Sequence, residues 1–147
     1  MPSLERAYGI KGAAIAIGMA VVAGAVHGVM AATLNVLVVK LAVGLAGSIV
    51  MIIAGVVSAR RSFWASVGTG LAMGCCFFLF RWGCWTMMTG GVDGLTSFLS
   101  AGPLGWTNWF HQAGISDFWL VEAVSMFVPA MIGCVAGQER PANPNEA

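Results

Sequence analysis

Charge is scarce in this sequence. Only 9% of its 147 residues are Asp, Glu, Lys or Arg, whereas about 25% is usual in a soluble domain. Hydrophobic residues make up 59% of the chain, too large a share for a well-hydrated soluble surface. The formal net charge is +1 and there is no block of Lys or Arg, so no nucleic-acid partner is expected. The composition indicates an integral membrane protein.

Cysteine and histidine are also scarce, with four and two residues. Cys75 and Cys76 are adjacent, Cys84 and Cys134 stand alone, and no CxxC motif is present, which argues against a redox centre. The two histidines have no spaced Cys, Asp or Glu neighbours of the kind that form metal sites. No nucleotide-binding loop, catalytic triad or cofactor fingerprint appears, so the sequence assigns no cofactor.

Four apolar stretches are long enough to cross a membrane. A spanning helix needs about 20 apolar residues, and these stretches cover about 10–32, 34–58, 63–89 and 118–137. Backbone amides in lipid must be satisfied within the segment, and no alternating β-barrel pattern appears, so the stretches are expected to be helices. The predicted fold is all-α: one integral membrane domain of four transmembrane helices, with a C-terminal tail over 138–147.

Basic residues predict the orientation. Arg6 and Lys11 precede the first span, Arg60 and Arg61 join the second to the third, and Arg140 follows the fourth. The turn after the first span and the long segment after the third contain no Lys or Arg. The positive-inside rule then predicts cytoplasmic termini, and we expect the inner (plasma) membrane of a bacterium.

The first span has a second interpretation. Basic residues followed by the apolar run 13–26 and by Val29-Met30-Ala31 also fit a cleavable signal peptide. Cleavage would leave three spans and would move the C-terminus to the opposite side. We favour retention, because a first span often mimics such a signal.

Small residues recur at a spacing of four in several spans. Gly24 and Gly28 form a GxxxG motif in the first span, and Gly70 and Gly74 occupy a similar stripe in the third. Small residues at this spacing let helix backbones approach closely in lipid. Packing within one bundle is the favoured interpretation, since four helices have enough seams to use these stripes; contact between copies is the alternative.

Four strongly polar residues lie in four different spans: His27, Lys40, Arg81 and Glu122. If the spans alternate in direction, all four lie in the same leaflet, where charge is costly and usually kept for pairing or function. Arg81 and Glu122 lie on consecutive antiparallel spans and are predicted to pair. Lys40 has no acidic partner in any span, so it either snorkels to the interface or, with His27, faces a cavity, a lipid phosphate or a partner's carboxylate.

The segment 90–117 is too long for a tight turn and too aromatic for a disordered linker. We expect two short helices, interfacial or re-entrant, broken at Gly102-Pro103. Trp106 and Trp109 would lie at headgroup depth. Three roles stay open for the segment: an aromatic belt, a lid over the polar cluster, or a docking surface for another subunit.

Two classes of function lead. The first is a small non-enzymatic subunit of a larger transport, secretion or energy-transducing complex, indicated by tiny extramembrane parts, small-residue stripes and an aromatic outer segment. Its partners would be the lipid bilayer and other membrane proteins. The second is a self-sufficient homo-oligomeric transporter, channel or holin-like pore that uses Lys40, Arg81 and Glu122. A membrane enzyme ranks third, because Glu122 with His27 is the only candidate acid–base pair.

Overall fold

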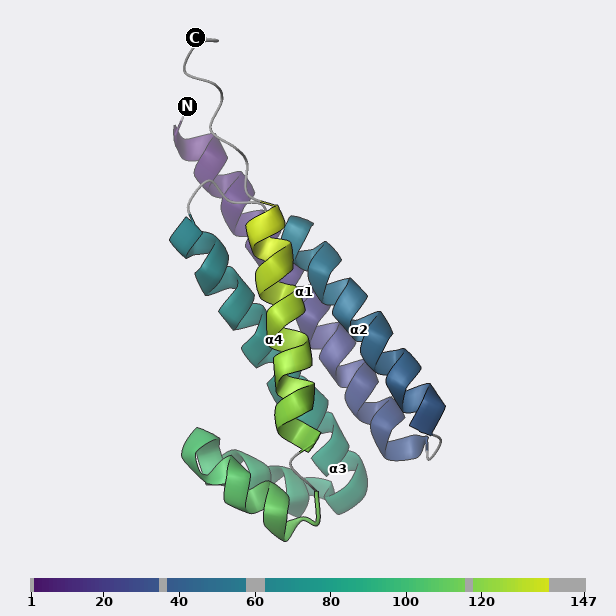
Figure 1. Cartoon of the computed structure of the whole chain (residues 1–147). Coiled ribbons are helices and arrows are strands. Elements are labelled where there is room, and N and C mark those ends of the chain that lie inside the picture. The colour runs from purple at the N-terminus through teal and green to yellow at the C-terminus, as the bar shows by residue number, and fades with distance from the viewer. Residues whose placement is uncertain (1, 35–36, 58–62, 116–117, 138–147) are drawn as a thin grey trace.

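The computed structural model describes residues 2–34, 37–57, 63–115 and 118–137. Over these residues it is all-α, with helices α1 (Pro2–Thr33), α2 (Leu37–Val57), α3 (Phe63–Gln112) and α4 (Phe118–Ala136) (Figure 1). All four are long and apolar enough to cross a membrane. Arg60, Arg61 and Arg140, from which the orientation was predicted, lie outside the described residues.

The helix bounds follow the expected spans in most places. The first helix begins at Pro2, but its membrane-length apolar part covers Ile10–Thr33, close to the expected span of about 10–32. The second begins at Leu37 rather than at residue 34. The long part of the third helix breaks at Gly91, close to the expected end near residue 89, and helical structure continues beyond the break to Gln112.

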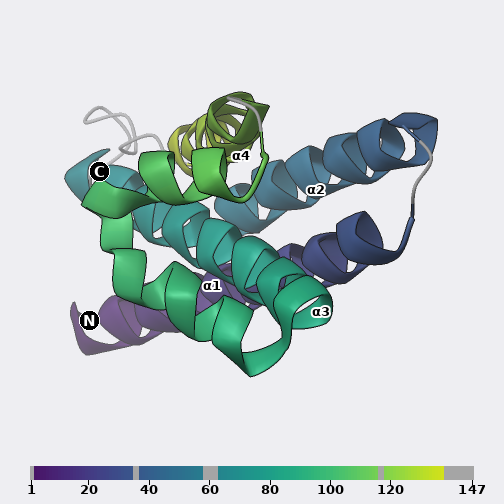
Figure 2. The same cartoon turned by 90° about the horizontal axis from the view of Figure 1, so that it is seen from below.

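The four helices alternate in direction along the chain and form a bundle in which α1 and α4 each pack against both α2 and α3, with the α1–α3 and α2–α4 pairs running parallel. The consecutive helices α2 and α3 touch only slightly, so they lie across a diagonal of the bundle. Figure 2 shows α3 between α1 and α4. At one end of the bundle α1 ends and α2 and α4 begin. We call it the hairpin end, after the segment 92–112 described below, and we call the opposite end the terminal end.

Two glycines divide α3 into a long helix and two short arms. Gly91 (φ 61°) and Gly102 (φ 63°) adopt left-handed backbone conformations, which cost little without a Cβ atom. The break at Gly102 is the one expected from Gly102-Pro103. The two arms, which we call the hairpin (residues 92–112), fold back across the end of the bundle (Figure 2).

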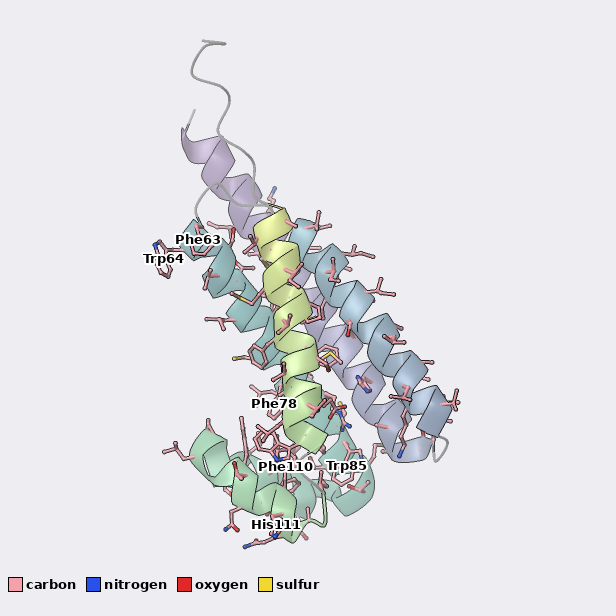
Figure 3. All side chains as sticks on the ribbon, in the orientation of Figure 1. Phe63, Trp64, Phe78, Trp85, Phe110 and His111 are labelled. Atoms are coloured by element: carbon pink, nitrogen blue, oxygen red, sulfur yellow. The ribbon has the colours of Figure 1, made fainter. Side chains whose placement is uncertain are left out.

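Aromatic side chains fasten the hairpin to the bundle. Phe98 and Phe110 are fully buried in one cluster with Phe78 and Trp82 of the long part of α3. Phe110 also stacks on Trp119 of α4, with ring centroids 4.8 Å apart. Figure 3 shows Phe78 and Phe110 where the hairpin meets the lower end of α4.

The two hairpin tryptophans also bind the arms to each other. The indole N–H of Trp106 donates to the carbonyl oxygen of Phe98 at 3.0 Å, and that of Trp109 donates to the hydroxyl of Ser97 at 2.9 Å. The ring of Trp106 stacks on Phe98 with an interplanar angle of 9°. Both residues therefore act as links inside the hairpin, and their depth in a membrane stays a prediction.

The small-residue stripes lie at seams inside the bundle. A Cβ atom at Gly24 would lie 2.5 Å from the carbonyl oxygen of Phe77, and one at Gly28 would overlap the carbonyl oxygen of Arg81. Both glycines therefore face α3. Gly70 and Gly74 face α4, so all four serve the packing of one bundle.

Candidate functional site

The polar residues of α1, α3 and α4 meet near the hairpin end. The Nε of Arg81 donates a hydrogen bond to Glu122 Oε1 at 2.9 Å, which is the pairing expected from the sequence. His27 Nε2 lies 3.5 Å from the same oxygen. The three side chains form one compact charged cluster, mostly removed from solvent.

Close packing of α1 on α3 positions this cluster. Because Gly28 has no side chain, the main chain of Arg81 lies directly against α1, and His27 is brought to the same level. The ring of Phe77 meets the imidazole edge-on at 5.8 Å between centroids. The guanidinium carbon of Arg81 lies 3.9 Å from the centroid of the Trp82 ring, a favourable cation–π distance.

The cluster keeps unused hydrogen-bonding capacity. Arg81 Nη1, His27 Nδ1 and Trp82 Nε1 are buried and have no hydrogen-bond partner among the described residues. Buried polar atoms are nearly always paired, so each such atom calls for an explanation. Arg81 Nη1 and Trp82 Nε1 are both donors, so each is free to bind an acceptor atom.

A cavity of about 660 Å³ lies beside the cluster, between α2 and α4. Its polar lining comes mainly from His27, Lys40, Arg81, Glu122, Ser48 and Ser125. Its apolar lining includes Leu41, Leu45, Trp82, Trp85, Ile115, Trp119, Val121 and Met126. The cavity is therefore an apolar chamber with charged groups gathered in its wall.

The cavity arises because α2 and α4 diverge toward the hairpin end, as Figure 1 shows. The hydroxyl of Ser48 donates to the carbonyl oxygen of Ser125 at 3.3 Å, where the helices are still close. Toward the terminal end they touch directly, since a Cβ atom at Gly55 would lie 2.6 Å from the amide nitrogen of Cys134. The space between α2 and α4 therefore narrows toward the terminal end and closes inside the bundle.

Lys40 lines this cavity and forms no ion pair with a carboxylate in the part of the chain that the structure describes. This placement is compatible with both sequence interpretations, because Lys40 is also exposed and lies close to the start of α2. Gly44 and Ser48 follow on the same face of α2 and also line the space. All four polar residues named from the sequence thus border one chamber.

The tryptophan wall of the cavity was not foreseen from the sequence. Trp82 and Trp85 come from α3 and Trp119 from α4, and Figure 3 shows Trp85 beside the hairpin at the end of the bundle. The seam between Gly55 and Gly133 was also missed. Its sequence signal is the GxxxG motif of Gly133 and Gly137, because a Cβ atom at either glycine would meet the backbone of α2.

No known family model, curated protein or solved structure matches this chain. Within the described ranges, no group of three or more His, Cys, Asp or Glu side chains is placed to hold a metal ion. The chemistry of the site must therefore be argued from its own residues. They can hold an anionic group by charge and hydrogen bonds, beside walls suited to an apolar body.

Proposed function

We propose that the protein is a four-span protein of a bacterial inner membrane, with both termini cytoplasmic, and a small non-enzymatic subunit of a larger membrane complex. That complex would serve transport, secretion or energy transduction. The observation that carries the proposal is the shape of the cavity: it offers a binding chamber at the hairpin end but closes inside the bundle.

The closed part of the bundle argues against transport by one chain alone. Beyond the chamber, the interior is filled by a buried cluster that includes Met51, Met73, Phe77 and Met126. On the side toward the terminal end, α2 and α4 are in direct contact at Gly55 and Gly133. A binding chamber without a passage suits a subunit that binds a ligand, while partner subunits carry out the transport, secretion or energy transduction.

The outward faces of the helices support membrane insertion. Large apolar side chains point outward along the whole bundle, among them Val38 (73% exposed), Leu45 (68%) and Val121 (61%). Soluble monomers rarely expose apolar patches larger than a few hundred Å². Lipid tails are the environment in which such faces need no polar partner.

Two isolations from membranes test the proposal. The tagged full chain is extracted in mild detergent, purified and weighed by native mass spectrometry, with an unrelated tagged four-span protein as control. A complex of fixed mass that contains other polypeptides in whole-number ratio is expected. A closed homo-oligomer of this chain alone would contradict the proposal and favour the self-sufficient transporter, channel or pore. Recovery in the soluble fraction would reject membrane insertion itself.

A further inference from the structure

We infer that the cavity binds the phosphate headgroup of an anionic membrane lipid, whose acyl chains leave the bundle between α2 and α4. The inference rests on one part of the proposed function, the embedding of the four helices in a membrane. It requires no protein partner.

The cations around the cavity outnumber the carboxylates. Lys40 and Arg81 both line it, and Glu122 is the one acidic residue in its described lining. Glu122 is already engaged by Arg81 Nε, which leaves the charge of Lys40 without a counter-ion among the described residues. One added negative charge would balance the site.

Arg81 lines the cavity and supplies the second positive charge of the site. Its side chain retains only 9% of its accessible surface, and Nη1 is buried without a described partner. A guanidinium offers a rigid fork of N–H groups that matches the oxygens of a phosphate. With Nε held by Glu122, the outer part of the fork stays oriented beside the chamber.

The rest of the lining fits the apolar part of an amphiphile. Trp82, Trp119 and Met126 form much of the wall, and the volume of about 660 Å³ falls in the usual range of ligand sites. A free inorganic anion has no apolar part, so it would leave these apolar walls without a matching surface. The site therefore suits a headgroup attached to hydrocarbon.

The exposed rim of the chamber is apolar. Leu41 and Leu45 of α2 are 54% and 68% exposed, and Val121 of α4 is 61% exposed. All three line the cavity and look outward, while Trp85 and Ile115 border it on the side of the hairpin. In a membrane such a rim faces lipid tails, so a lipid reaches the headgroup site by sliding between α2 and α4.

A charge substitution tests the headgroup contact. The full chain, purified in mild detergent, is titrated with phosphatidylglycerol and separately with phosphatidylcholine, and retained lipid is counted by native mass spectrometry. One phosphatidylglycerol per chain is expected to bind in preference to phosphatidylcholine. Lys40→Gln is expected to lower that preference about fivefold, the effect of one lysine at an anionic lipid surface. Lys11→Gln, an exposed lysine on α1 outside the cavity, is the matched control.

A steric substitution tests the position of the chains. Gly44 lines the cavity and a Cβ atom there meets no atom within 4 Å, so the side chain of Gly44→Leu would begin in open space and occupy part of the chamber. The variant is expected to lose the retained phosphatidylglycerol. Gly18→Leu is the control, because Gly18 has equally open surroundings on α1 outside the cavity.

Several results would overturn the inference. These are equal retention of the two lipids, equal effects of Lys40→Gln and Lys11→Gln, or unchanged retention in Gly44→Leu. Preferential retention of myristate would make the ligand a carboxylate amphiphile, and displacement by equimolar inorganic phosphate would make it a free anion. Failure to find a protein complex would leave a measured preference for phosphatidylglycerol intact, so the two proposals fail separately.

Discussion

Replacing Glu122 with glutamine would test whether the charged cluster holds the bundle together. Glutamine keeps an acceptor oxygen for Arg81 but removes the negative charge that lies 2.9 Å from Arg81 Nε. The guanidinium would then remain as a buried charge without compensation. Breaking a buried ion pair in this way costs about 3–5 kcal/mol. We expect Glu122→Gln to lower the free energy of unfolding by an amount in this range.

The assay is reversible unfolding of the detergent-solubilised protein in a titration with sodium dodecyl sulfate, followed by tryptophan fluorescence. Asp93→Asn is the matched control, since Asp93 is an exposed carboxylate on the hairpin. It is expected to change stability by less than about 0.5 kcal/mol, as is usual for exposed sites.

A double variant completes the test. Arg81→Gln with Glu122→Gln removes both charges and leaves two amides able to bond to each other, so it should cost less than the sum of the single changes. If Glu122→Gln behaves like Asp93→Asn, the pair is a screened surface contact worth under about 1 kcal/mol. Strict additivity of the two single changes would show that the residues do not interact. Either outcome would refute the reasoning.

Two further predictions concern glycines. Gly28→Leu should separate α1 from α3, because even a Cβ atom there overlaps the carbonyl oxygen of Arg81. In the same unfolding assay we expect this variant to be destabilised by several kcal/mol. Gly18→Leu, whose surroundings are open, should be near neutral. Equal stability of these two variants would contradict the α1–α3 seam. Gly102→Ala should cost about 1–3 kcal/mol, because Gly102 has φ 63° and ψ 175°, a conformation that residues with a Cβ atom rarely adopt. Helical Gly90→Ala, with open space at its Cβ position, should instead be neutral or stabilising, and equal effects would show that the break is not strained.

The helices and one contact of the site could be predicted from the sequence for simple physical reasons. Apolar stretches of membrane length favour helices whatever packs around them, and the expected spans overlap α1, α2, the long part of α3 and α4. Arg81 and Glu122 could be paired because they lie on consecutive helices at matching depth. The break at Gly102-Pro103 follows from local backbone chemistry.

The remainder depends on how the helices are ordered around the bundle. Hydropathy does not tell that α1 packs on α3 or that α2 lies diagonal to α3, and this order decides that His27 reaches Glu122. The cavity depends on the divergence of α2 and α4, which no single segment encodes. By contrast, the break at Gly91 falls in the Gly90-Gly91 pair, a local turn signal beside the expected end of the third span near residue 89.

The position of Glu122 in the last helix has a consequence for how the chain is made. During synthesis, Arg81 on α3 is complete 41 residues before its counter-ion emerges. If α3 entered a membrane alone, it would carry an uncompensated charge, and an isolated arginine at depth is costly. The hairpin lies between these two helices in the chain. We therefore expect α3 and α4 to insert as one unit, and a chain that stops before α4 to be left with its third helix poorly inserted.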